Sequence, residues 1–439
     1  MSGGAPISLL SRRAALRFGA AVGLAAIAPA QAQEATEDLE QRLREAARRG
    51  GAVRLRPGVT TIRSLQLPDG ATLVGAGGST LRLHGAGPLL WARDAGRIAL
   101  ESVTLDGAGG FLEKDRGLID FENVARLSVH GCTIKNSPAQ GIRLWRCGGV
   151  FAQNLVERAQ AAAYHSLNGF GVDIDGNHLR DCGDNGVLVW TSKPGDFEGS
   201  RVRNNLIEDI RNVSGGDGPY GNGVGIWRSG GVRVENNRIF RCAYTFVRNN
   251  EGTDILVEAN DCKVCGERAM YAEFGAKRAT FRNNRIEDAG AGVAVANARS
   301  HGTDFGVVTG NTIVNLRETH PDNEFGPEMF WRTGILGERN CEIAGNTIVG
   351  PAWIGIGLEG WRENVRAEDN VIEGADYGIT FAVGPGAGEG AILRNRIRRS
   401  RKAAVTAFAY ITPASADLMA PGATAESFPG LTMRDNSLE

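Results

Sequence analysis

The hexapeptides VRNNLI (Val202–Ile207), VENNRI (Val234–Ile239) and FRNNRI (Phe281–Ile286) are copies of one pattern, valine or phenylalanine, two residues, asparagine, one residue, isoleucine. With looser copies included, the repeat asparagines are Asn154, Asn177, Asn205, Asn237, Asn260, Asn284, Asn311, Asn346, Asn370 and Asn395. The intervals between them are 23, 28, 32, 23, 24, 27, 35, 24 and 25 residues. A minimum near 23 residues with sporadic additions is typical of a solenoid whose insertions emerge as loops.

Each repeat also contains a second pattern, in which glycine precedes alternating apolar residues. It reads GIRLW from Gly141, GVLVW from Gly186, GVGIW from Gly223 and GIGLE from Gly355. Alternation with period two, bounded by glycine and asparagine, predicts short strands separated by turns. The sequence therefore predicts an all-β right-handed parallel β-helix of about a dozen coils. We expect the asparagines to adopt left-handed backbone angles at a sharp turn and to stack from coil to coil through side-chain hydrogen bonds.

The N-terminal segment predicts export. Arg12 and Arg13 precede a weakly apolar run, and Ala30-Gln31-Ala32 offers a cleavage site between small residues. The paired arginines resemble a twin-arginine signal, although Ala15 stands where that signal usually has phenylalanine, and an ordinary secretory signal is the alternative. The run is too short for a stable membrane span. We expect residues 1–32 to be a signal peptide, the twin-arginine export machinery to be a partner, and a periplasmic or secreted bacterial location.

The remaining chain, 33–439, is predicted to be one β-helix domain. Thr36 to Gly50 is expected to be a capping helix, with Thr36 at its N-terminus and Gly50 ending it. Residues 411–439 lose the repeat, regain it only over Leu431–Leu438, and are expected to form an irregular C-terminal cap. Three insertions interrupt the coils, at 191–200, 211–222 and 317–333, and the last two should emerge along one edge.

The seven cysteines admit two interpretations. Cys182, Cys242 and Cys265 each follow a repeat asparagine by five residues, so a column of buried thiols is favoured. A disulfide between Cys242 and Cys265, on consecutive coils, is the alternative in an oxidising compartment.

The candidate binding and catalytic residues form a column of outward side chains. In the glycine-led strand, the first and third residues after glycine are apolar and face the core, so the second and fourth face outward. The fourth position reads Trp145, Trp190, Trp227, Asn249, Glu273, Ala296, Glu338, Glu359 and Ala382. Either loops cover these tryptophans and the glutamates are surface charges, or the column lines a groove that receives sugar rings. Asp217, on the 211–222 insertion near Trp227, is a further candidate for binding substrate.

Glu338, Glu359 and Glu273 are the candidate catalytic residues. Glu338 and Glu359 are one coil apart, and like charges at that distance raise one pKa, which yields an acid and a carboxylate near neutral pH. Glycoside cleavage needs such a pair. Tyr271, at the neighbouring outward position, is a candidate substrate-binding residue that could act as acid or base in a lyase.

Other candidate sites are weaker. His165 and His301 lie near strand ends and are expected to be hydrogen-bonded turn residues, with a role as acid–base groups as the alternative. Asp173 and Asp175 are too few for a calcium site. We predict no cofactor and no metal ion, although a calcium requirement stays open. A formal charge of −1 for 439 residues, with no basic face in the repeats, argues against nucleic acid as a partner.

The repeats and the stretch ending GGAVRLRPG (Gly50–Gly58) resemble the pectin-lyase-like superfamily of right-handed parallel β-helices. The paired arginines, with GNGVGIW (Gly221–Trp227) and MYAEFG (Met270–Gly275), look like a family of twin-arginine-translocated repeat proteins without an assigned activity. The superfamily implies polysaccharide substrates, acted on by lyases, hydrolases or epimerases. The catalytic signatures of polygalacturonases, alginate epimerases and pectate lyases are missing from this sequence, so no named activity is inherited.

The sequence thus predicts an exported protein that binds a cell-envelope or extracellular polysaccharide along the Trp/Asn/Glu column. Whether it also cleaves or modifies the polysaccharide is left open. The alternative is a non-catalytic carbohydrate-binding or envelope scaffold protein.

Overall fold

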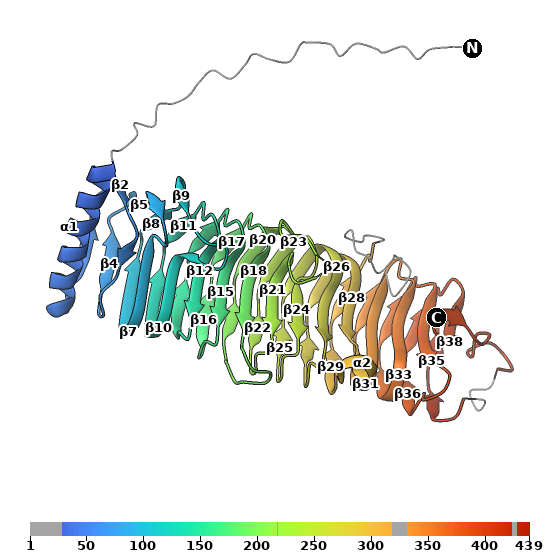
Figure 1. Cartoon of the computed structure of the whole chain (residues 1–439). Helices are drawn as coiled ribbons and strands as arrows, with labels where there is room; N and C mark the ends of the chain where they lie inside the picture. The colour runs from blue at the N-terminus through green and yellow to red at the C-terminus, as the bar shows by residue number, and fades with distance from the viewer. Residues whose placement is uncertain (1–28, 217, 318–331, 424–427) are drawn as a thin grey trace, which may run out of the picture.

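The chain forms a right-handed parallel β-helix of about 14 coils, closed at its N-terminal end by a helix (Figure 1). The computed structural model describes residues 29–216, 218–317, 332–423 and 428–439. Neighbouring coils pair strand to strand in parallel register, because the repeat returns the chain to the same position about every 23 residues. The expected fold class is therefore confirmed, with somewhat more coils than the dozen expected.

Three parallel sheets run along the solenoid, and six long strands bend from one sheet into the next. Sheet 1 contains the glycine-led strands and their counterparts on the other coils: β3 (Leu65–Gln66), β7 (Leu90–Glu101), β10 (Gly117–His130), β12 (Gln140–Trp145), β15 (Ala162–Leu167), β18 (Asn185–Trp190), β21 (Asn222–Trp227), β24 (Val247–Asn250), β26 (Asp261–Glu273), β28 (Arg285–Val295), β31 (Thr333–Ala344), β33 (Ile354–Glu368), β35 (Tyr377–Ala382) and β38 (Ala403–Ala409).

Sheet 2 leads up to the asparagine turn. It contains the C-terminal halves of β7, β10, β31 and β33, together with β1 (Val53–Leu55), β4 (Thr72–Gly75), β13 (Gly149–Ala152), β16 (Val172–Asp175), β19 (Arg201–Arg203), β22 (Arg233–Glu235), β25 (Leu256–Glu258), β27 (Thr280–Arg282), β29 (Gly306–Thr309), β36 (Gly390–Leu393) and β40 (Leu431–Arg434).

Sheet 3 follows the asparagine turn. It contains the N-terminal halves of β26 and β28, together with β2 (Gly58–Ile62), β5 (Ser79–Leu83), β8 (Thr104–Asp106), β11 (Thr133–Lys135), β14 (Leu155–Glu157), β17 (His178–Arg180), β20 (Leu206–Ile210), β23 (Arg238–Cys242), β30 (Thr312–Val314), β32 (Thr347–Val349), β34 (Val371–Glu373), β37 (Arg396–Arg398) and β41 (Ser437–Leu438). Outside the three sheets, β6 (Gly85–Ala86) pairs with β9 (Gly110–Phe111), and β39 (Thr412–Pro413) runs antiparallel to β38.

The asparagines form a continuous buried ladder, as expected. In each link the side-chain Nδ2 donates to the Oδ1 of the asparagine one coil on, for example from Asn260 to Asn284 at 2.9 Å. The same Nδ2 donates to a backbone carbonyl of the preceding coil, for example that of Val234. The expectation of left-handed angles at the asparagines is wrong, because the residue before each asparagine takes that conformation, for example Ala259 with φ 55°. The left-handed residue completes the turn, and the side chain of the asparagine that follows it points into the solenoid.

The cap helix α1 (Pro29–Arg48) covers the N-terminal end with Leu39 and Leu43, both buried in the core (Figure 1). It begins earlier than expected, so Thr36 lies inside the helix and does not cap it. The Thr36 hydroxyl donates to the carbonyl of Ala32 and accepts from the backbone N–H of Arg63, which ties the helix to the solenoid. Gly50, with φ 64°, follows the last turn as expected.

The expected signal peptide lies outside the described residues up to residue 28, and Pro29–Ala32 form the first turn of α1. In the part of the chain that the structure describes, no helix is both long and apolar enough to cross a bilayer. At the C-terminus, β40 and β41 continue sheets 2 and 3, and Asn436 adds one more member to the asparagine ladder.

All seven cysteines are buried free thiols. Cys242 pairs in register with Ile210 on one side and Cys265 on the other, which confirms the expected column and gives no disulfide between the two. Burial raises the pKa of the Cys182, Cys242 and Cys265 thiols. These thiols are therefore packing groups and poor nucleophiles.

Candidate functional site

The outward column of sheet 1 runs along consecutive coils with a register that differs from the expected one in two places. Trp190 lies directly beside Trp227, but Leu167 separates Trp145 from Trp190. The three tryptophans are therefore not on three consecutive coils. The coil between them, β15, has the sequence AAYHSL and lacks the leading glycine, so its outward residue could not be aligned from sequence.

Asn249 does not belong to the outward column. Asn249 pairs with the core residue Ile226, whereas Asn250 pairs with Trp227. The Asn249 side chain is completely buried, and its Oδ1 accepts a hydrogen bond from the backbone N–H of Gly252. Asn250 therefore takes the place in the column that the sequence assigned to Asn249.

The aromatic part of the column is a contiguous group of rings. The ring centroids of His165 and Trp190 are 4.8 Å apart and those of Trp190 and Trp227 are 5.1 Å apart, both in edge-to-face geometry. The tryptophans are half-buried, so loops cover them only in part. Trp227 also contacts the guanidinium of Arg228 at 4.4 Å. An aromatic surface with part of each ring in solvent is suited to stacking against the apolar face of a flat ligand.

His165 is a polar group without a partner inside this aromatic group. Both ring nitrogens are buried and make no hydrogen bond, which contradicts the expectation of a satisfied turn histidine. Burial, reinforced by the charge of Arg143, lowers the pKa of His165 to about 4. The imidazole is therefore neutral at pH 7, with a donor and an acceptor that the described residues leave unused.

Arg248 joins two carboxylates at the next outward positions. Its guanidinium donates to Glu267 at 3.0 Å and to Glu273 at 2.6 Å, and all three side chains are at least mostly buried. Burial raises the pKa of Glu273, and the charge of Arg248 opposes that rise. Tyr271 hydrogen-bonds to Glu273, and burial raises the Tyr271 pKa well above its ordinary value. The phenol of Tyr271 is consequently a proton donor at neutral pH and not a base.

The 211–222 insertion packs against this cluster, whereas the tryptophans, which one of the two interpretations expected the insertions to bury, stay half-buried. Gly218 packs so closely that a Cβ there would lie 2.1 Å from a guanidinium nitrogen of Arg248. The Tyr244 hydroxyl donates to the carbonyl of Gly216 and holds the loop in place. Asp217 lies outside the described residues, so its part in the site stays a prediction.

Glu338 and Glu359 are the carboxyl groups at the C-terminal part of the column. Their preceding residues, Gly337 and Leu358, pair in register. Glu338 Oε2 accepts from the backbone N–H of Ala298, at the start of α2 (Ala298–His301), at 2.7 Å. Burial raises its pKa.

Glu359 is 3% exposed although it points away from the core. Its Oε1 accepts from the Thr380 hydroxyl at 2.5 Å, and its side chain lies over Gly357, where a Cβ would be 2.9 Å from Glu359 Cγ. Burial is the main cause that raises its pKa to about 7, and the charge of Glu338 adds to it. The expected rise in the pKa of one of the two glutamates is present, but desolvation produces most of this rise and repulsion between like charges is secondary.

Sequence reasoning missed Arg143, Arg248 and Glu267. Arg143 lies two residues after Gly141 and Arg248 two residues after Phe246, which replaces the glycine, and this outward position could have been scanned for charges in the same way as the fourth. Among the other candidates, Asp173 and Asp175 both pair with Arg203, and His301 stacks edge-to-face on Phe274. No group of three or more His, Cys, Asp or Glu residues able to hold a metal ion occurs within the described ranges.

Comparison with solved structures shows shared architecture at low sequence identity. An alginate lyase described as a new PL6 enzyme in complex with a trisaccharide aligns over 93% of this chain and 93% of its own, with a TM-score of 0.55 and 13% identity. The Streptococcus pneumoniae surface protein and adhesin PfbA aligns over 85% of this chain and 95% of its own, with a TM-score of 0.51 and 12% identity. These likenesses concern the fold alone.

No curated protein sequence matches the chain. The family model described as a right handed beta helix region matches residues 117–305 and 222–410, which together span more than half of the sequence. The chain therefore belongs to the right-handed β-helix family.

Proposed function

We propose that this is an exported β-helix protein that binds a cell-envelope or extracellular polysaccharide along sheet 1 and acts on it with Glu359, Glu338 and Glu273. One observation carries the proposal. Glu359 is a carboxyl group on the outer side of the sheet, desolvated until its pKa is about 7, and the same column carries a half-buried aromatic surface on its N-terminal coils. Groups whose pKa lies near the working pH are suited to general acid and base catalysis.

The aromatic group and the carboxyl groups have different roles in the proposal. His165, Trp190 and Trp227 receive the faces of sugar rings. A glycan that follows the solenoid axis then passes from these rings over Arg248 to the carboxyl groups. Two solved relatives in fold, one an alginate lyase and one a surface adhesin, are consistent with glycan chemistry on such a scaffold.

The reaction class depends on which groups act together. In a hydrolase, protonated Glu359 gives its proton to the leaving oxygen and ionised Glu338 activates water. In a lyase, ionised Glu273 removes the proton next to the uronate carboxyl group, and the phenol of Tyr271 gives a proton to the leaving oxygen; in an epimerase, the phenol returns a proton to the opposite face of the same carbon. Export through the twin-arginine machinery is proposed from the resemblance of the N-terminal segment.

A non-catalytic carbohydrate-binding or envelope scaffold protein is the second candidate. The observation in its favour is that Arg248, Glu267 and Glu273 saturate one another and Thr380 satisfies Glu359. A buried cluster with a purely structural role also needs each of its charged groups to be paired or hydrogen-bonded.

The test is a panel of neutral and uronate polysaccharides incubated with the mature protein, with and without calcium. New reducing ends, unsaturated uronate products and retention on each glycan are measured. Glu359→Gln should abolish turnover and keep retention, whereas Glu363→Gln, an exposed matched change, should alter neither. Retention without product would support the binding protein, and neither product nor retention would refute both candidates.

A further inference from the structure

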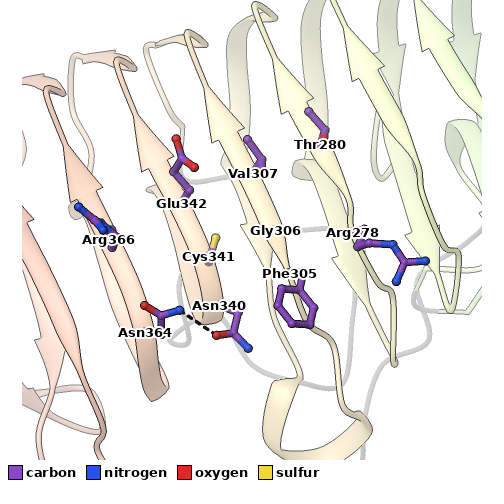
Figure 2. Close-up of a pocket in the computed structure, with 10 residues that line it drawn as sticks. All are labelled: Arg278, Thr280, Phe305, Gly306, Val307, Asn340, Cys341, Glu342, Asn364 and Arg366. Carbon is purple, nitrogen blue, oxygen red and sulfur yellow. Dashed lines mark hydrogen bonds between the residues drawn. The ribbon is translucent and has the colours of Figure 1, made fainter.

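A pocket of about 390 Å³ lies on sheet 2, away from the column of sheet 1 (Figure 2). It spans β27, β29, β31 and β33 at the edge where each strand of sheet 2 begins. Figure 2 shows the ring of Phe305 between Arg278 and Asn340, with Glu342 and Arg366 farther along the strands. A volume of this size is within the range of small-ligand sites.

Phe305 occupies a backbone position that does not suit it. The residue before sheet 2 has a positive φ in five successive coils, with values of 57°, 52°, 57°, 43° and 54° at Asp254, Arg278, Phe305, Asn340 and Asn364. Asparagine and aspartate tolerate this conformation, whereas it is strained for a bulky side chain. Phe305 is also 53% exposed, so burial does not offset the strain. A strained, exposed aromatic ring beside a pocket indicates a ligand-binding role.

Among the charged groups around Phe305, one carboxylate, that of Glu342, is left as a hydrogen-bond acceptor for a ligand. Arg278 donates two hydrogen bonds to Asp254, and Arg366 pairs with Glu368, so both guanidinium charges are neutralised within the chain. Asn364 donates to the side-chain oxygen of Asn340 at 3.0 Å. Glu342 is exposed, and its carboxylate has no hydrogen bond or ion pair within the described residues.

The pocket continues along sheet 2. A second depression of about 500 Å³ shares Asn364 and Arg366 with the first and extends over β36 and β40 to Arg434. The two together form a trough that crosses successive strands, parallel to the solenoid axis. An extended chain ligand fits a trough better than a compact ligand does.

We propose that this trough is a second saccharide-binding site that takes neutral hexose units of a glycan chain. The apolar face of one ring stacks on Phe305, and two of its hydroxyls donate to Glu342. A uronate is disfavoured beside Phe305, because Arg278 is already paired with Asp254 and the charge of Glu342 is negative; Arg434 lies at the far end of the trough. This site does not depend on the proposed function of sheet 1, since it shares no residue with that column.

The test uses Phe305→Asn in the mature protein, with cello-, laminari-, manno- and galacto-oligosaccharides as neutral probes and oligomannuronate and oligogalacturonate as acidic probes. Asparagine is the residue of the two following coils at this position, so the variant should unfold at the same temperature as the wild type or higher. Binding by isothermal titration calorimetry should weaken about tenfold or more for the neutral probe that the wild type prefers. Glu342→Gln should weaken the same probe.

Phe170→Asn is the matched control, because Phe170 is 52% exposed and lies outside the trough. It should leave binding unchanged. The proposal is overturned if the wild type binds no neutral probe, if acidic probes bind preferentially through Phe305, or if Phe305→Asn binds as tightly as the wild type. Trp190→Ala distinguishes the two sites, since it should spare binding at Phe305 whether or not sheet 1 also holds glycan.

Discussion

Replacing Glu359 by glutamine should stabilise the protein at alkaline pH while removing its proposed catalytic group. Glu359 is 3% exposed, and its pKa rises from an ordinary 4.5 to about 7. The folded state therefore holds a proton that the unfolded chain releases. Stability is full below about pH 4.5, falls as the pH rises toward 7, and stays reduced above it.

The size of the loss follows from the two pKa values. A rise from 4.5 to about 7 corresponds to about 3 kcal/mol of unfolding free energy at alkaline pH. Glutamine carries no charge, and its amide oxygen still accepts from the Thr380 hydroxyl. Glu359→Gln should thus match the wild type at about pH 4 and exceed it by about 3 kcal/mol at about pH 8.5.

The assay is urea-induced unfolding of both proteins at a series of pH values, followed by fluorescence and circular dichroism. Glu363→Gln, at an exposed position, is the control and should change stability little at any pH. If the difference between Glu359→Gln and wild type does not grow with pH, desolvation is not what perturbs this carboxyl group, and the reasoning on its chemistry fails.

Three further predictions follow from the fold and the aromatic surface. Asn284→Ala leaves the backbone N–H and Nδ2 of Asn260 without their acceptor, so chemical denaturation should show that the free energy of unfolding falls by about 2–6 kcal/mol. The control Asn436→Ala, at the half-buried end of the ladder, should lower it by about 1 kcal/mol. Equal losses for the two variants would contradict the stabilising role of the buried ladder. Leu43→Ala should cost about 2–5 kcal/mol and increase hydrogen exchange in the first coil, and unchanged exchange there would argue against a capping role. Trp190→Ala should weaken retention of the glycan bound by sheet 1 about tenfold without loss of secondary structure, and unaltered retention would remove the rings from that site.

The candidate site was most predictable where the sequence carried a marker of register. Trp190 and Trp227 are the last residues of glycine-led strands, and they are neighbours on sheet 1 as expected. In β24, Phe246 stands in the place of glycine, so the outward residue was assigned to Asn249 and the structure shows Asn250. A shift of one residue exchanges the two faces of a strand, so the prediction placed the buried side chain of Asn249 on the surface.

The sequence by itself determined the architecture, because the asparagine ladder and the apolar alternation are local patterns repeated at a nearly constant interval. A repeat of that kind specifies the coil and the stacking of coils together. The chemistry of the outward face was decided only by tertiary structure. Whether Glu359 is an ordinary surface carboxylate or a group with a pKa of about 7 depends on its burial over Gly357 and on the neighbouring coils that supply Glu338 and Thr380. Desolvation is a property of the surroundings in space, and residues from three separate coils create it.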